Sequence, residues 1–205
     1  MDVWHKARAN ARYENVFTDH LMSRYENITI TNQIPDLDPN MLNVTISADK
    51  LLVGLENDKY LPPKRSANCI EILRNLECDE IQVALEISRV SFDFKIYSKD
   101  TYYYSELHEE QHRNLKDSRL KNIFCNGMPI KVPRYLQRLA RDCWRLKCAK
   151  EFGFNYSIIW FDYLSKHGFP KDFLSEGIHE YYLPGQFSFE RFMCEIDEDF
   201  KNNVV

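Results

Sequence analysis

Hydrophobic and polar positions alternate with two different periods along the chain, and these periods separate helical from extended segments. Apolar side chains recur at roughly helical spacing over residues 4–24, which predicts a leading helix. Over residues 27–34 and 42–55 they alternate with polar side chains instead, and the second stretch contains Asp49 followed by Lys50, a pair typical of a turn. We therefore expect a β-strand at 27–34 and a β-hairpin at 42–55.

The clearest strand signal is the segment 80–98. Its apolar residues occupy odd positions up to Ile87 and even positions from Val90 onward. A shift of one residue turns every side chain of a strand to the opposite face of its sheet. We therefore expect a β-bulge or a tight hairpin near Ser88 and Arg89.

Helical spacing and helix-stop signals dominate the rest of the chain. Ser188 is a candidate N-cap, and residues 178–183 are a predicted strand. Helices are predicted at residues 67–76, 102–121, 131–150, 156–167, 171–175 and 188–196. The fold class that follows is α+β, with a mixed sheet formed by the hairpin 42–55 and the long strand or hairpin 80–98, packed with several helices and followed by a helical C-terminal half.

With 205 residues, of which 44% are hydrophobic, the chain is long enough to bury its own core. We expect a single domain over 1–205, with a possible subdivision into a strand-rich part, 1–100, and a helix-rich part, 101–205. Neither a signal peptide nor a run of roughly 18 apolar residues stands out. The expected location is intracellular, in the cytoplasm or the nucleus, with the six cysteines present as reduced core thiols and with no cofactor.

Charge changes the picture, because it is segregated along the sequence. The net charge is −4 overall, but residues 113–150 carry 11 Lys and Arg against two Asp and Glu, whereas both flanking segments are acidic. On a helical wheel four arginines of this segment fall on one side and its apolar residues on the other. This arginine stripe consists of Arg134, Arg138, Arg141 and Arg145, and Arg119, Lys121 and Lys131 extend it.

Guanidinium groups bind phosphates and carboxylates through two parallel hydrogen bonds. The arginine stripe therefore predicts a non-enzymatic interaction module, or adaptor subunit of a protein complex, that binds nucleic acid or an acidic protein partner and not a membrane. The alternative is that the chain's own acidic segment, Glu195–Asp199, covers the stripe through solvated ion pairs.

Two patterns are candidates for catalysis. His108 and His112 match the HExxH spacing, in which a helix turns two histidines toward one zinc ion, although the polar residues around them favour an exposed helix. Asp93 and Lys95 share one face of the predicted strand 80–98, and Asp79 precedes it. This pattern resembles the (Asp/Glu)-x-Lys half of the PD-(D/E)xK nucleases, with Cys78 at the position of the usual proline. The resemblance implies metal ligation by Asp79 and Asp93 and catalysis by Lys95, and so a metal-dependent nuclease as the alternative function.

Overall fold

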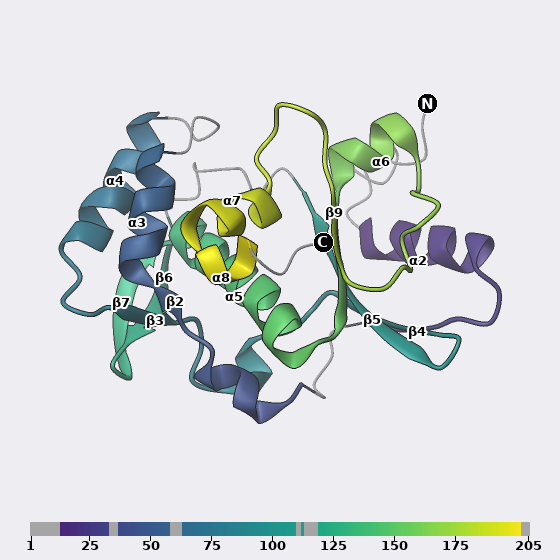
Figure 1. The fold of residues 1–205 in the computed structure, drawn as a ribbon, viewed down its shortest axis with the longest axis horizontal. Helices are drawn as coiled ribbons and strands as arrows, with labels where there is room; N and C mark the ends of the chain where they lie inside the picture. Colours follow the sequence, from purple (N-terminus) through teal and green to yellow (C-terminus); the bar gives the residue numbers. More distant parts are fainter. Residues whose placement is uncertain (1–12, 33–36, 58–62, 110–111, 113–118, 202–205) are drawn as a thin grey trace.

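Two β-sheets and a long helix that packs against both of them form the centre of the molecule (Figure 1). The computed structural model describes residues 13–32, 37–57, 63–109, 112 and 119–201. Sheet A has the strand order β1-β4-β5-β8-β9, and sheet B has the order β2-β3-β6-β7. Sheet A contains β1 (Thr29–Asn32), β4 (Phe94–Ser98), β5 (Thr101–His108), β8 (Asn155–Trp160) and β9 (Ile178–Tyr181). Sheet B contains β2 (Ile46–Ser47), β3 (Glu80–Gln82), β6 (Leu120–Cys125) and β7 (Met128–Pro133).

Sheet A is mixed, whereas sheet B is antiparallel. β4 and β5 form an antiparallel hairpin across residue 100, and β8 then runs parallel to β5 with His108 opposite Trp160. A parallel pair needs a long crossover connection, and α5 (Arg134–Phe152) lies in that connection. The α+β class and the mixed sheet of the sequence prediction are thus confirmed.

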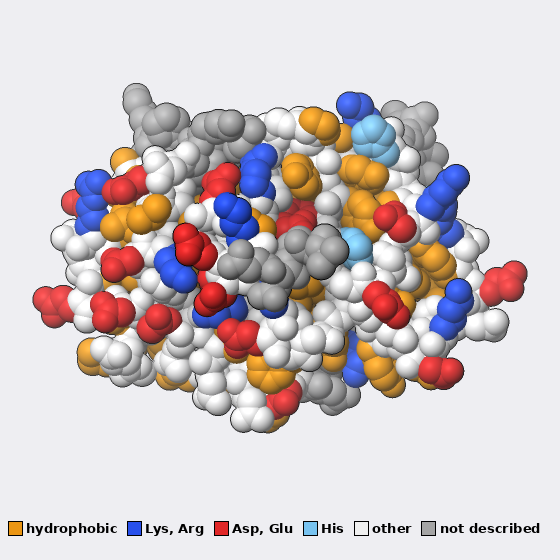
Figure 2. All heavy atoms as spheres, viewed as in Figure 1, with side chains coloured by type: hydrophobic (Ala, Val, Ile, Leu, Met, Phe, Trp, Pro, Cys, Tyr) orange, Lys and Arg blue, Asp and Glu red, His pale blue; other side chains and the backbone are white. Residues whose placement is uncertain are grey.

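Helices cover the two sheets on several sides. In Figure 1, α3 and α4 lie together at one end of the molecule and α2 at the other, while α7 and α8 lie in front of α5. Their bounds are α2 (Tyr13–Arg24), α3 (Ala48–Asn57), α4 (Pro63–Arg74), α6 (Phe161–His167), α7 (Phe189–Ile196) and α8 (Glu198–Lys201), with 3₁₀ helices η1 (Pro39–Asn43) and η2 (Ile87–Arg89). On the face drawn in Figure 2, acidic and basic side chains are interspersed rather than segregated.

The apolar interior has two parts. The larger cluster joins sheet B, α3 and α7 to the apolar face of α5, where Leu136, Leu139 and Leu146 are buried as predicted. The smaller cluster lies between α2 and sheet A, with Phe17 stacked on Phe94. Within the described part of the chain, no helix combines the length and the apolarity that crossing a bilayer requires.

Several predicted elements are present. α2 agrees with the leading helix from residue 13 onward, and residues 1–12 lie outside the described part. α4 and β9 agree with the predicted helix and strand, and α5 begins at Arg134 and ends at Gly153 in the left-handed conformation. The Ser188 side chain accepts a hydrogen bond from the Arg191 backbone N–H, so the predicted N-cap of α7 is confirmed.

The predicted hairpin at 42–55 is wrong, because β2 has only two residues and α3 follows it directly. The residues that α3 buries, Ala48, Leu51 and Leu55, have helical spacing. The long strand or hairpin at 80–98 is also wrong. The chain leaves sheet B after β3, passes through η2 and enters sheet A at β4, so the change of register marks a change of sheet.

Two predicted helices contain strands in part. Residues 101–108 form β5 and residues 155–160 form β8, whereas α6 confirms the second half of the helix predicted at 156–167. The second half of β5 is buried on both faces, including Glu106 and His108. Polar residues at buried strand positions hide the alternation on which strand prediction depends, and they are typical of functional sites. At residues 171–174 the structure has turns rather than the short helix.

Two of the six cysteines are not reduced thiols. Cys78 and Cys125 form a disulfide with a Cα–Cα distance of 5.9 Å, whereas the other four are free. The disulfide joins the segment before β3 to the end of β6. These two strands pair directly, with Ile81 of β3 as the register partner of Cys125.

Candidate metal centre and the basic pocket beside it

His108 is the last residue of β5, and its imidazole is fully buried. Its ring makes edge-to-face contacts with Trp160 of β8, at a centroid distance of 5.0 Å, and with Phe189 at the start of α7, at 5.1 Å. Strand pairing fixes this position, because Trp160 is the register partner of His108. The HExxH context predicted for His108 is therefore wrong, since His108 ends a strand rather than lying on a helix.

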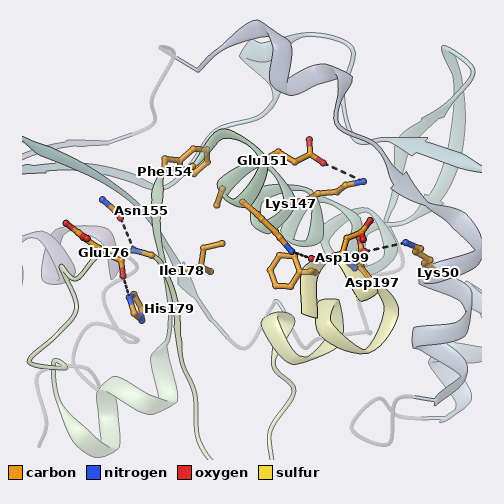
Figure 3. A pocket seen from close by; sticks show the side chains of 15 residues that line it. Lys50, Lys147, Glu151, Phe154, Asn155, Glu176, Ile178, His179, Asp197 and Asp199 are labelled. Carbon is orange, nitrogen blue, oxygen red and sulfur yellow. Dashed lines mark hydrogen bonds and ion pairs between the residues drawn. The ribbon is translucent and has the colours of Figure 1, made fainter. Parts of the chain in front are cut away.

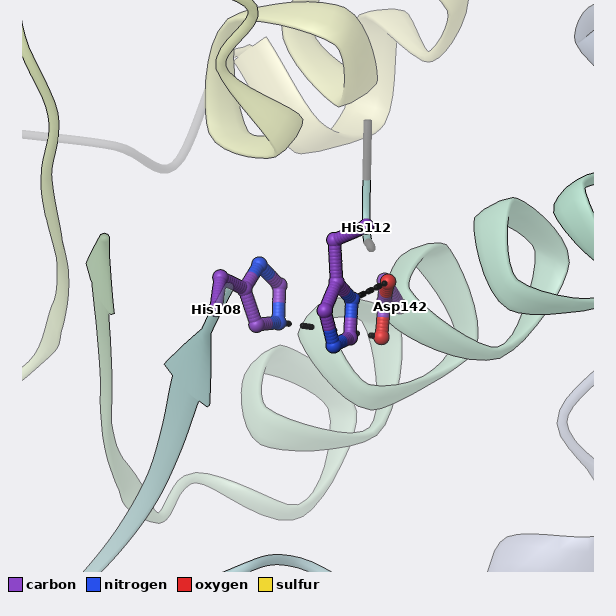
Figure 4. A group of neighbouring side chains, drawn as sticks. All are labelled: His108, His112 and Asp142. Atoms are coloured by element: carbon purple, nitrogen blue, oxygen red, sulfur yellow. Dashed lines mark hydrogen bonds and ion pairs between the residues drawn. The ribbon is translucent and has the colours of Figure 1, made fainter. Parts of the chain in front are cut away.

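The spacing nevertheless brings both histidines to one place, and α5 adds a carboxylate (Figure 4). The imidazoles of His108 and His112 stack with centroids 4.0 Å apart. His112 Nδ1 lies 3.0 Å from Asp142 Oδ2, and His108 Nε2 lies 3.8 Å from Asp142 Oδ1. One ligand atom from each side chain lies within 4.8 Å of the others, and we call His108, His112 and Asp142 the metal-ligand triad.

Two separations in the metal-ligand triad come close to those around a first-row divalent cation, whereas the three ligand atoms as a set lie only within 4.8 Å of one another. With metal–nitrogen and metal–oxygen bonds of about 2.1 Å, neighbouring ligand atoms are about 3.0 to 3.4 Å apart. The His112–Asp142 distance of 3.0 Å is already in that range, and the His108–Asp142 distance of 3.8 Å exceeds it by a few tenths. The His112 side chain is 13% exposed, whereas His108 and Asp142 are buried, so the His112 side is where solvent reaches the triad.

The surroundings of Asp142 favour the ionised form of its carboxyl group. Burial by itself raises the pKa of the Asp142 carboxyl, but the imidazoles of His112 and His108 and the guanidinium of Arg145 lower it more, and its pKa falls well below its usual range. Asp142 is the only acidic residue of α5 before its last turn. It therefore provides an ionised oxygen ligand inside a basic helix.

A buried ion-pair network supports the triad from behind. Arg145 Nη1 donates to Asp142 Oδ1 at 2.7 Å, and its Nε lies 3.1 Å from Glu106 Oε1. Arg145 also donates twice to the Ser91 carbonyl. Burial lowers the pKa of Arg145, but Glu106 and Asp142 raise it more, so the guanidinium stays charged. This network fixes the carboxylate plane of Asp142, as groups that hydrogen-bond to metal ligands do in known metal sites.

The other three arginines of the stripe line a pocket of about 690 Å³ between α5, β6 and the segment after β3. We define the basic pocket by Arg89, Lys121, Arg134, Arg138 and Arg141, which supply its five cations. Of the lining residues that the structure describes, Glu86 alone is acidic, and it pairs with Arg89 at 3.3 Å. Among the described residues, no acceptor satisfies the buried Nε of Arg141, and burial, followed by the charge of Arg145, lowers the pKa of Arg141 to about 10.

The basic pocket and the metal-ligand triad are neighbours. Arg138 precedes Asp142 by four residues on α5, so their side chains lie on adjacent turns of the same face. Burial raises the pKa of Glu109, which follows His108 in the chain, and the charges of His112 and Arg138 lower it. Arg138 therefore lines the basic pocket and also acts on Glu109, the residue next to His108.

The remaining residues that the sequence analysis proposed for binding lie outside both sites. Arg119, before β6, accepts a hydrogen bond from the Arg134 N–H with its carbonyl, and Lys131 is exposed on β7. Neither lines the basic pocket. The acidic segment contacts lysines elsewhere: Asp197 pairs with Lys50 at 3.5 Å, and the Asp199 carbonyl accepts from Lys150.

The residues proposed from the nuclease resemblance belong to different sheets. Asp79 is exposed before β3 of sheet B, whereas Asp93 and Lys95 lie at the start of β4 in sheet A. Asp93 Oδ2 accepts from the Leu107 N–H at 3.1 Å, so it supports the end of β5 next to His108. The Lys95 ammonium lies over the Tyr102 ring, 4.4 Å from its centroid.

A wider pocket of about 1050 Å³ lies at the C-terminal end of α5, bounded by β9 and α8 (Figure 3). Its charged groups pair around the rim: Lys50 with Asp197, and Lys147 with Glu151 at 3.9 Å. His179 Nε2 lies 2.7 Å from the Glu176 carbonyl. These groups bind one another and do not converge on a common point, unlike the metal-ligand triad (Figure 3).

Sequence reasoning missed Asp142 and Glu106, the two carboxylates at the centre of the site. A signal for Asp142 exists, because it is the only acidic residue in the basic stretch 118–150. A signal for Glu106 is its position two residues before His108, which places both on one face of a strand once residues 101–108 are assigned as β5. The chain matches no known protein-family model, and neither a curated protein nor a solved structure shows significant similarity to it.

Proposed function

We propose that this chain is a metal-dependent hydrolase that cleaves phosphodiester bonds of nucleic acid, with a divalent cation held by His108, His112 and Asp142. The observation that carries the proposal is the convergence of these three ligand-type side chains beside a pocket with five cationic residues. A metal centre alone fits many reactions, and a basic pocket alone fits passive binding. Their contiguity through Arg138 favours chemistry on a phosphate ester.

Two imidazoles and one carboxylate leave coordination positions open for water and substrate. A divalent cation held by His108, His112 and Asp142 would lower the pKa of a bound water and polarise a phosphoryl oxygen, which is the chemistry that hydrolysis of a phosphodiester requires. Arginines next to the cation neutralise charge on the remaining phosphate oxygens.

Metal binding is the first test. Chelator-treated protein titrated with Mn²⁺ and with Zn²⁺ in a calorimeter should bind one equivalent. His112→Ala and Asp142→Asn should each lower the affinity at least tenfold, because each removes one of three protein ligands. His167→Ala removes an exposed histidine of α6 and should bind the metal as the wild type does. A wild-type protein that binds neither metal would remove the basis of the proposal.

Cleavage is the second test. Labelled single-stranded and duplex oligonucleotides, incubated with the Mn²⁺-loaded protein, should yield fragments that are absent with chelator or with Asp142→Asn. Arg138→Gln should retain the metal and lose most of the cleavage rate, since Arg138 lies between the metal-ligand triad and the basic pocket. A wild type that binds metal but leaves all these substrates intact contradicts the assigned reaction.

A second candidate is non-enzymatic binding of nucleic acid or an acidic protein, within a complex, through the basic pocket. The observation in its favour is that Arg134, Arg138 and Arg141 line one pocket that needs no metal to bind an anion. One experimental result distinguishes the hydrolase from the binding module. Salt-dependent binding without cleavage at any metal concentration supports the binding module.

A further inference from the structure

The basic pocket has an apolar wall as well as a cationic one. Leu85 is 46% exposed and lines the pocket together with the half-buried ring of Phe124 on β6. From α5, Arg134, Arg138 and Arg141 line the same pocket. The side-chain amide of Gln137 donates to the Asn122 carbonyl at 3.1 Å on the pocket rim. The two walls thus offer different chemistry to one ligand.

An unpaired nucleotide has this combination of a flat apolar surface and an anion. Its phosphate matches guanidinium groups, and its base matches an aromatic ring, on which every base can stack. A duplex offers its phosphates but keeps its bases inside the stack, where the wall formed by Phe124 and Leu85 cannot reach them. The volume of about 690 Å³ belongs to the range of pockets that enclose small organic ligands.

The geometry of Arg141 is a second indication of an anion. Its Nε is buried, and no described residue supplies an acceptor for it. A buried donor without an acceptor destabilises a fold, so such an atom is typical of a site completed by a ligand or water. Arg138, which lines the pocket with Arg141, precedes Asp142 by one helical turn, so a phosphate held by both arginines lies near the metal-ligand triad.

We propose that the basic pocket binds one unpaired nucleotide of a single-stranded nucleic acid, with its phosphate on Arg138 and Arg141 and its base against Phe124 and Leu85. This inference rests on the proposed function, because it specifies the substrate as single-stranded and places the bound nucleotide next to the metal-ligand triad. The binding itself requires no metal, so it is tested apart from cleavage.

The experiment is fluorescence anisotropy with chelator-treated wild-type protein at several salt concentrations. The probes are a labelled oligothymidylate and a blunt duplex of the same length. The single strand should bind at least tenfold more tightly. Phe124→Ala should weaken binding of the single strand by about tenfold, the scale of one lost stack, and leave the duplex unchanged. Leu85→Ser, which alters an exposed side chain, should act in the same direction without affecting the fold.

Charge is tested through the salt dependence. Arg138→Gln and Arg141→Gln should each reduce the slope of log affinity against log salt by about 0.7, as expected for one lost phosphate contact on a single strand. A merely destabilised protein would lose active fraction without this change in slope. The matched controls are Phe152→Ala at the end of α5 and Lys166→Gln on α6, which lie outside the pocket and should match the wild type.

Equal affinity for the single strand and the duplex, or unchanged single-strand binding by both Phe124→Ala and Leu85→Ser, would overturn the assignment of the pocket. A protein that binds the single strand as described but never cleaves it supports the pocket and contradicts the metal-dependent activity. A protein that cleaves while binding both probes equally contradicts the pocket alone.

Discussion

The Arg145 guanidinium is enclosed by two buried carboxylates and a backbone carbonyl. These neighbours determine how much the free energy of unfolding changes when the guanidinium is removed. Glu106 and Asp142 are 2% and 1% exposed, and both pair with Arg145. Breaking a buried ion pair by removing one partner leaves a charge in the interior without compensation. The side chain therefore matters more for stability than any exposed arginine of the chain does.

We expect Arg145→Leu to lower the free energy of unfolding by about 3 to 5 kcal/mol, because it leaves both carboxylates without their cation. Urea denaturation followed by circular dichroism measures this change. Arg191→Leu on α7 is the control, since its ion pair with Glu195 at 3.9 Å is partly exposed and should contribute less than about 1 kcal/mol. Equal effects of the two substitutions would contradict the burial argument.

Glu180 makes stability depend on pH in a definite direction. Burial raises the pKa of its carboxyl above the ordinary 4.5, although hydrogen bonds from Ser188, Glu190, Trp160 and Phe189 lower it in part. A raised pKa means that the folded state binds the proton more tightly, so this contribution to stability is complete below pH 4.5 and is lost as the pH rises through the folded-state pKa. The stability of the wild type relative to Glu180→Gln should therefore decrease from pH 4 upward, in paired urea denaturations. A relative stability that increases over that range would contradict the assigned shift.

At the scale of elements, α5 could be predicted from the sequence because its whole length obeys one helical period with polar and apolar sides. β5 could not, because Glu106 and His108 occupy buried positions that apolar residues usually fill. Their partners, Arg145 and Asp142, come from α5. These ion pairs join residues that are far apart in the sequence, so the local periodicity predicts neither the strand nor the site.

The arginine stripe shows the same limit. A helical wheel gives the direction of Arg145 from the axis of α5 but not what lies there, and that side is covered by Ser91, in the segment before β4, and by Glu106 on β5. Arg134, Arg138 and Arg141 do line a basic pocket, although the wheel placed all four arginines together. The periodicity thus predicted the helix and its apolar face, whereas the division of the stripe required the sheet.

α3 and α7 approach each other closely at Gly54. A Cβ atom at this position would lie 2.4 Å from Phe192 Cζ and 2.8 Å from Ile196 Cγ2. Alanine should favour the helix by about 1 kcal/mol, but this overlap exceeds that gain, since overpacking a buried contact costs about 1 to 3 kcal/mol or more. We expect Gly54→Ala to lower the melting temperature, measured by differential scanning calorimetry.

A double-mutant cycle checks the cause of that change. Phe192→Leu removes the end of the ring, so Gly54→Ala should destabilise the Phe192→Leu protein less than it destabilises the wild type. Val53→Ala is the matched control on the same helix, because Val53 is 50% exposed and its replacement should leave stability nearly unchanged. Additive effects of Gly54→Ala and Phe192→Leu would show that the two side chains do not clash.

At the scale of the whole molecule, the disulfide between Cys78 and Cys125 links the segment before β3 to the end of β6 and closes a separation of 47 residues. Restricting the unfolded chain over that length stabilises the fold by about 4 kcal/mol in the chain-entropy model. The four remaining thiols are free, and burial raises the pKa of each, to about 11 for Cys69. They should therefore react slowly with alkylating reagents while the protein is folded.

The thiol count is the direct test of this arrangement. Protein denatured without reductant should show four reactive thiols in a colorimetric titration and six after reduction. Cys78→Ser combined with Cys125→Ser should lower the urea midpoint as reduction does, whereas Cys194→Ser, at a half-buried position on α7, should not. Six reactive thiols in the unreduced denatured protein would show that the two cysteines are merely neighbours, and sheet B would then depend on the packing of α3, α4 and α5 alone.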